Sequence, residues 1–132
     1  MTDSIDANVV LRCVLGDVPE LRKKALEFLS SSPSTHYLSN QALLECIYVM
    51  ETLEEMSREE IANHLNVFLG RYDGTIVYDY RLTNLAFPMY LKHPKLSWAD
   101  CALAAEAEIN GHEPLFTFDK KLAAQHPSAK LI

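Results

Sequence analysis

The chain has 132 residues, which is enough for one domain with a single core. Apolar residues make up 48% of it and argue against a disordered chain. Asp and Glu outnumber Lys and Arg by 18 to 12, and the formal charge of −6 argues against a generic basic coat for nucleic acid, although not against a local basic rim. No apolar run approaches the ~20 residues of a membrane span, and the N-terminus lacks the pattern of a signal peptide. We therefore expect a cytoplasmic protein that does not contact membranes.

The N-terminal half alternates short strands with amphipathic helices. A short strand ends at Asp6, and a helix over residues 7–15 follows it, with Gly16 as the C-cap. Pro19 opens a second helix, whose predicted buried stripe consists of Leu21, Ala25, Leu26 and Leu29. The next predicted elements are a strand at residues 36–38, a helix from Ser39 or Asn40 to about residue 54, and a helix that begins with the capping box Ser57–Glu60 and runs through residue 69.

The C-terminal half continues the alternation. The clearest β-branched strand covers residues 75–78, and Asp79 is placed to cap the next helix, which Pro88 should interrupt or kink near Phe87. The later predicted elements are a helix from residue 97 to 109, a strand at 114–118, a helix after Asp119 and an edge strand at 130–132. Strands that alternate with helices in this way predict a parallel sheet covered on both faces.

The cysteines and histidines carry little functional signal. Cys13, Cys46 and Cys101 are odd in number, far apart and without a CxxC pair, so we expect free thiols in the core. The five histidines are scattered without a metal-binding spacing, and we expect them at surface or loop positions.

Four acidic residues stand out, namely Asp6, Glu45, Asp100 and Asp119. Asp6 and Asp119 fall where a predicted strand gives way to a helix, and ligands of open parallel sheets bind outside such strand ends. Asp100 lies in the first turn of its helix and could face the same edge. Glu45 has apolar neighbours on both sides, where an unpaired carboxylate would be costly.

Each acid also has a structural alternative. Asp6 and Asp119 could simply cap helices, Asp100 could belong to a capping box with Ser97, and Glu45 could be an exposed helix residue. If the four carboxylates converge, they repel one another unless a cation neutralises them. Oxygen ligands without Cys or His favour Mg²⁺ or Mn²⁺, and such a cluster suits phosphodiester hydrolysis by a metal-activated water.

The residues around these acids resemble the PIN-domain family, and within it the toxin ribonucleases of the VapC type. The resemblance covers nearly the whole chain, and four stretches carry it: SIDANVVLR at 4–12, SNQALLE at 39–45, WADCALAA at 98–105 and LFTFDKKL at 115–122. Each motif is weak singly, but four in the right order make a specific match. One departure is Ala7, which stands where many relatives carry Thr or Ser.

The resemblance implies one PIN-like domain over residues 1–132. Its expected fold is a three-layer α/β/α sandwich around a short, mostly parallel central sheet. The expected activity is that of an endoribonuclease dependent on Mg²⁺ or Mn²⁺, acting as the toxin of a toxin–antitoxin pair, with a homodimeric state and a small cognate antitoxin as inhibitor. The implied site residues are Asp6 and Asp100 as the firmest metal ligands, Glu45 and Asp119 to complete the catalytic pocket, and Asn8 and Thr117 to orient carboxylates or water.

Three basic residues lie near the acidic motifs. Arg12, Lys120 and Lys121 could hold RNA phosphates beside the acidic pocket, or they could be ordinary solvated side chains. Two other functions stay open. Another Mg-dependent phosphoryl hydrolase is one, although the DxDx[TV] pattern of haloacid dehalogenases fails at Asp6. A catalytically inert PIN-fold binding module is the other, and metal binding would distinguish it.

Overall fold

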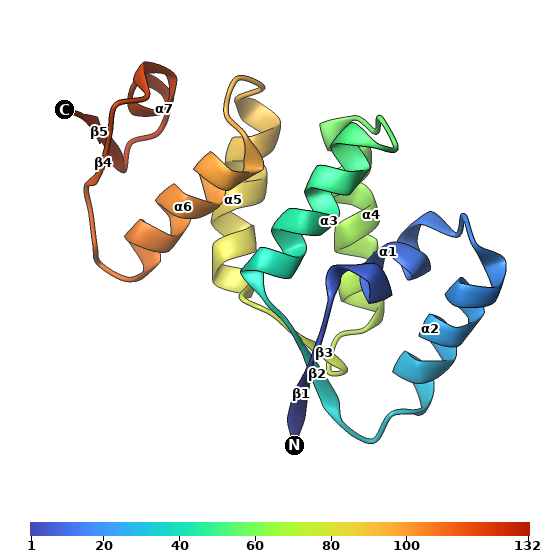
Figure 1. The fold of residues 1–132 in the computed structure, drawn as a ribbon. Helices are drawn as coiled ribbons and strands as arrows, with labels where there is room; N and C mark the ends of the chain where they lie inside the picture. The colour runs from blue at the N-terminus through green and yellow to red at the C-terminus, as the bar shows by residue number, and fades with distance from the viewer. The chain divides into compact units, whose positions relative to one another are not determined.

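Seven helices alternate with short parallel strands in the computed structural model, which describes residues 1–132 (Figure 1). The chain divides into two compact units, residues 1–78 and residues 79–132. All strand pairs are parallel, so the predicted α/β class with a short parallel sheet is confirmed. None of the helices combines the length and the hydrophobicity that crossing a membrane requires.

The N-terminal unit contains a three-stranded parallel sheet with the strand order β1-β2-β3. Its register pairs Thr2 with Thr35 and Ile5 with Leu38. Parallel strands need long crossovers, and here each crossover is a pair of helices. The elements are β1 (Thr2–Ile5), α1 (Ala7–Leu15), α2 (Pro19–Ser31), β2 (Thr35–Leu38), α3 (Asn40–Thr52), α4 (Arg58–Arg71) and β3 (Ile76–Val77).

Local capping residues set the helix boundaries of this unit. Asp6 caps α1, and Gly16 ends it with a φ of 64°, a left-handed conformation that glycine adopts without strain. Ser39 caps α3, and the predicted capping box of Ser57 and Glu60 begins α4. The expected strand at residues 75–78 shortens to two residues in β3.

Helix α2 buries less of its apolar face than the sequence predicts. Only Leu29 of the predicted stripe is buried, whereas Leu21 is 42% exposed and Ala25 and Leu26 are half-buried. The cause is that α2 packs mainly against α1, so that one neighbour covers only a narrow strip of it. The exposed part of the stripe lines a surface groove described below.

The C-terminal unit combines a helical hairpin with a two-stranded parallel sheet. The elements are α5 (Tyr80–Lys92), α6 (Trp98–Ile109), β4 (Leu115–Thr117), α7 (Lys120–Gln125) and β5 (Ala129–Leu131). Trp98 at the start of α6 is buried against α5, with ring centroids 4.5 Å from Phe87 and 5.6 Å from Tyr90. These aromatic contacts hold the two helices together.

Of the two expected effects of Pro88, an interruption or a kink, the interruption is wrong, because α5 continues through Pro88 to Lys92. Proline inside a helix costs about 3 kcal/mol through a lost hydrogen bond and a steric clash. The flanking residues Phe87 and Tyr90 are buried against α6, and full burial of such a side chain returns about 1.5–3 kcal/mol. Tertiary packing therefore outweighs the local helix breaker, whose own ring is exposed.

The cysteines are free and buried, as predicted, and two histidines are buried as well, His126 in a loop as expected and His36 in a strand against expectation. His36 of β2 is completely buried, where its Nδ1 contacts the carboxylate of Asp3, its register partner on β1. His126 is buried after α7, where its Nδ1 accepts a hydrogen bond from the backbone N–H of Ser128 at 3.1 Å. In both cases a hydrogen-bonding partner of Nδ1 reduces the free-energy cost of burying the imidazole. The sequence does not reveal these partners.

Candidate metal and nucleic-acid site

Asp6 lies where β1 gives way to α1, as the sequence predicts. Its Oδ1 accepts hydrogen bonds from the backbone N–H groups of Asn8 at 3.0 Å and Val9 at 3.3 Å. The side chain is exposed, and its second oxygen takes no part in the cap. Asp6 is therefore held in one orientation by the helix while one carboxylate oxygen stays available to a ligand.

Glu45 lies on α3 and is exposed, so it takes the surface position that the sequence left open. The next residue, Cys46, is buried and donates its thiol to the carbonyl of Ala7 at 3.6 Å, which brings this part of α3 to the start of α1. Burial, with a smaller contribution from the negative charges of Glu45 and Asp6, raises the pKa of the Cys46 thiol to about 12. The two carboxylates therefore act on the same point of the N-terminal unit.

Asp100 forms a capping box with Ser97 at the start of α6. Its backbone N–H donates to Ser97 Oγ at 3.0 Å, and its Oδ2 accepts from the backbone N–H of Ser97 at 3.2 Å. The side chain is half-buried, and Oδ1 is not used by the box.

Asp119 caps α7 and follows β4, as predicted. Its Oδ1 accepts from the backbone N–H groups of Lys121 at 2.9 Å and Leu122 at 3.2 Å. Thr117 Oγ1 accepts the backbone N–H of Asp119 at 2.9 Å, so it fixes the main chain of Asp119 and not its carboxylate. Asn8 does contact the carboxylate of Asp6, but it does so through its main-chain N–H and not through its side chain.

The donor chemistry of these residues fits a hard divalent cation. Asp6, Asp100 and Asp119 each cap a helix with one carboxylate oxygen and leave the other oxygen free, and carboxylate oxygens are the ligands that hard divalent cations prefer. Asp6 and Glu45 belong to the N-terminal unit, and Asp100 and Asp119 to the C-terminal unit. No group of three or more His, Cys, Asp or Glu side chains is close enough together to hold a metal ion. Convergence of all four acids stays a prediction.

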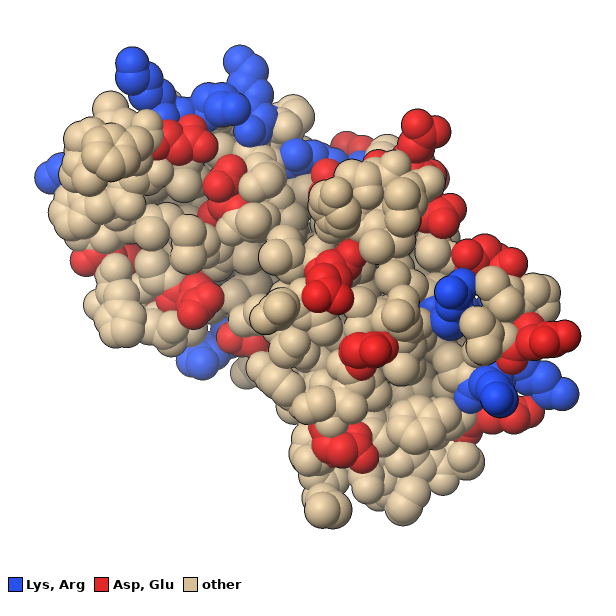
Figure 2. Space-filling view, in the orientation of Figure 1, with Lys and Arg blue, Asp and Glu red and all other residues tan.

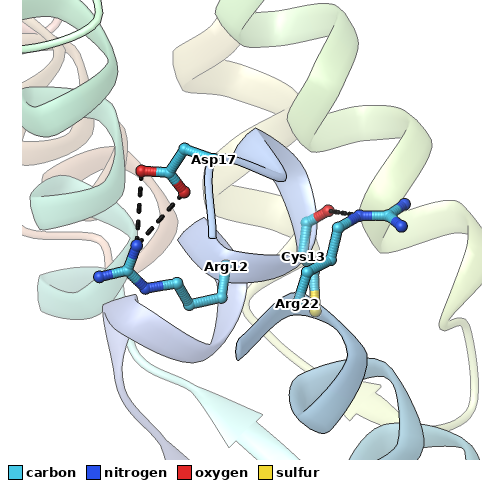
Figure 3. A network of polar contacts seen from close by, with 4 residues as sticks. All are labelled: Arg12, Cys13, Asp17 and Arg22. Carbon is cyan, nitrogen blue, oxygen red and sulfur yellow. Dashed lines mark hydrogen bonds and ion pairs between the residues drawn. The ribbon is translucent and has the colours of Figure 1, made fainter. Parts of the chain in front are cut away.

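The three predicted RNA-binding cations differ in their surroundings. Arg12 pairs with Asp17, with Nη1 at 3.2 Å and 3.4 Å from the two carboxylate oxygens, so much of its charge is already compensated (Figure 3). Lys120 and Lys121 are exposed and form no ion pair. Figure 2 shows Lys and Arg side chains over the C-terminal unit and around α2, with Asp and Glu spread across the visible face.

A surface groove of about 390 Å³ lies between α1 and α2. Its lining includes Asn8, which follows Asp6 by two residues in the sequence. It contains two side chains that the sequence analysis missed, Lys24 and Phe28. The ring of Phe28 packs against His36, with centroids 4.8 Å apart, while 46% of the side chain is exposed. The helical spacing of Leu21, Lys24 and Phe28 is the signal that could have placed them on one face. The groove is lined by Asn8, Val9, Arg12, Leu21, Lys24, Ala25 and Phe28.

Comparison with known proteins identifies one family. The model of the PIN domain matches residues 4–125, a range that contains all four predicted acidic residues. The observed helices and short parallel strands are compatible with the three-layer α/β/α arrangement of that domain. A search among curated proteins finds no match.

Proposed function

The chain belongs to the PIN domain family, and from this premise we propose that it is an endoribonuclease dependent on Mg²⁺ or Mn²⁺. PIN domains are generally metal-dependent nucleases that act on RNA, so the fold is a nuclease fold. The cleavage of internal RNA phosphodiester bonds, the choice of metal and the catalytic roles of Asp6, Glu45, Asp100 and Asp119 are our proposal.

The observation that best supports it is the double use of three aspartates. In Asp6, Asp100 and Asp119, one carboxylate oxygen is committed to a helix N-terminus and the other is open. The cap fixes the rotamer before any ligand arrives, which lowers the ordering cost of binding. A bound Mg²⁺ or Mn²⁺ would supply an activated water and would stabilise the leaving oxygen. The protein would provide the ligands and their orientation.

RNA binding would rest on cations and on one aromatic platform. Lys120 and Lys121 follow Asp119 directly and are free to contact phosphates. Lys24 and the exposed face of Phe28 lie in the groove that Asn8 also lines, and an aromatic ring beside a cation suits single-stranded RNA, whose bases stack on such rings. Arg12 would contribute only by exchanging Asp17 for a phosphate.

The decisive experiment is a cleavage panel with the full chain. Transfer RNA, ribosomal RNA and looped oligonucleotides are incubated with Mg²⁺, Mn²⁺ or EDTA, and p-nitrophenyl phosphate is the competing substrate. We expect internal cleavage of at least one RNA with metal, none with EDTA, and no phosphomonoester hydrolysis. Turnover of the monoester with every RNA intact would instead indicate another phosphoryl hydrolase. The absence of both metal binding and turnover would indicate an inert binding module.

We further propose that the chain is a toxin held inactive by a small antitoxin and that it forms a homodimer. These two proposals rest on the similarity of the four acidic motifs to VapC-type toxins. Expression of the chain alone should arrest growth, and Asp6→Asn should relieve the arrest. Co-expression with the product of the adjacent reading frame should give a stable complex without nuclease activity, and light scattering of the purified chain should give the mass of two copies.

A further inference from the structure

A cavity of about 140 Å³ lies in the N-terminal unit between α1, α2 and α4. Its floor is apolar and buried, formed by residues such as Cys13, Phe68 and Tyr72. Three exposed, nitrogen-containing side chains lie at its rim, those of Arg22, His64 and Arg71. No Asp or Glu lines the cavity. The remaining lining residues are Val14, Leu26 and Val67.

Arg22 is held in place by main-chain geometry. Its Nε donates to the carbonyl of Cys13 at 3.4 Å, as Figure 3 shows, and its stem lies over Gly16 at the end of α1. A Cβ at Gly16 would be 3.3 Å from Arg22 Cδ, so the absent side chain leaves room for this approach. The Nε contact leaves both terminal NH₂ groups of the guanidinium without a protein acceptor.

Arg71 reaches the same cavity from the last turn of α4, about two helical turns after His64 and on the same face of the helix. Neither Arg22 nor Arg71 forms an ion pair, although the chain carries 18 acidic residues. Burial raises the pKa of the Cys13 thiol, and the charges of Arg22 and Arg71 both act in the opposite direction. The two guanidinium groups therefore lie near one thiol, and their positive charge is not neutralised by the protein.

We propose that this cavity is a binding site for a phosphate group, with Arg22 and Arg71 as the principal ligands. Guanidinium groups bind oxyanions through paired N–H donors, and here two of them approach from different helices. A phosphate presents oxygens in several directions and can meet both, whereas a carboxylate presents two oxygens in one plane. The imidazole of His64 adds a third possible donor at the rim.

The site is distinct from the proposed metal site, because none of the four acidic residues lines it. It therefore goes beyond the proposed nuclease function and does not depend on it. Its phosphate has two possible sources, a small molecule such as inorganic phosphate or a mononucleotide, and the backbone of bound RNA. The chemistry of recognition is the same in both.

Phosphate binding is measured with the full chain by titration calorimetry and ³¹P NMR, using inorganic phosphate, a nucleoside monophosphate and acetate as probes. An RNA oligonucleotide in the presence of EDTA tests the second source without involving catalysis, because the proposed cleavage needs a bound metal. The variants are Arg22→Gln, Arg71→Gln and Arg22→Lys, and circular dichroism checks that each is folded. Lys23→Gln is the matched control, because Lys23 is an exposed cation on the same helix that does not line the cavity.

We expect Arg22→Gln and Arg71→Gln each to weaken phosphate binding at least tenfold and Lys23→Gln to leave it within twofold. Arg22→Lys should be intermediate, since it keeps the charge and loses the planar fork. If only the RNA responds in this pattern, the source is the RNA backbone. The proposal is overturned if inorganic phosphate, the nucleoside monophosphate and the RNA all fail to bind the wild type, if Lys23→Gln weakens binding as much as Arg22→Gln, or if acetate competes as well as phosphate. RNA cleavage by the wild type does not enter any of these outcomes.

Discussion

The double role assigned to Asp6 can be separated by two substitutions at the same position. Asp6→Asn keeps an oxygen that can accept the N–H groups of Asn8 and Val9, and Asn caps helices about as well as Asp. Asp6→Ala removes the cap, which typically costs about 1 kcal/mol. Both substitutions remove the negative charge that a cation needs. The two variants should therefore differ in their stability without metal, which depends on the cap, and should both lose the stabilisation by metal.

The expected shifts are large enough to measure by thermal unfolding. For a chain of this size, 1 kcal/mol corresponds to roughly 4 °C in Tm. Without metal, Asp6→Asn should melt close to the wild type and Asp6→Ala about 4 °C lower. A cation at a hundred times its Kd stabilises the native state by ~2.7 kcal/mol, or roughly 10 °C. Mn²⁺ or Mg²⁺ should thus raise the Tm of the wild type strongly and that of either variant much less.

Asp79 provides the matched control for this experiment. It also caps a helix after a strand, with Oδ1 accepting the backbone N–H of Leu82 at 3.2 Å, but it is not among the predicted metal ligands. Asp79→Asn should keep the full response to metal. If Asp6→Asn responds to metal as the wild type does, Asp6 is not a ligand. If the metal-free Asp6→Ala and Asp6→Asn proteins melt together, the capping argument is wrong.

Three further predictions concern the C-terminal unit. Asp100→Asn should abolish RNA cleavage while circular dichroism stays that of the wild type, because Asn can still accept from Ser97 but lacks the charge. Replacing Lys120 and Lys121 by Ala should weaken RNA binding more than metal binding and reduce the salt slope of RNA affinity by roughly 1 per lysine, as titrations at several salt concentrations would show. Burial lowers the pKa of His126, so the unfolded chain takes up a proton first as the pH falls through about 6.5, and stability should decrease there. His126→Asn should flatten this decrease in urea unfolding curves measured between pH 7.5 and 5.5, and an unchanged pH dependence would contradict the assignment.

Local signals in the sequence were sufficient to place the elements. Asp6, Ser57 and Asp119 begin helices as predicted, and Gly16 ends one, because capping depends on a few adjacent residues. The parallel class also followed from the alternation of strands and helices. These features need no knowledge of distant contacts.

Features that depend on tertiary neighbours were predicted less well. Pro88 stays inside α5 because the aromatic residues around it are buried against α6. His36 is buried because strand register places Asp3 beside it, and register is not visible in a single sequence. The cavity with Arg22 and Arg71 has the same origin, since its two cations come from helices that are far apart in the chain.

The two interpretations of the acidic residues, as helix caps and as metal ligands, are compatible with one another. A parallel strand that ends at a sheet edge is followed by a helix, so one of the first two residues after the strand lies both at the edge where ligands bind and at the N-cap of that helix. An aspartate there has two oxygens for two tasks, and in Asp6 and Asp119 one oxygen holds the helix while the other is unused. The observation of a cap is thus no evidence against a metal ligand. It explains how a carboxylate at the surface can be held still enough to serve as one, and it is why Asn, which keeps the cap and removes the charge, is the substitution that separates the two roles.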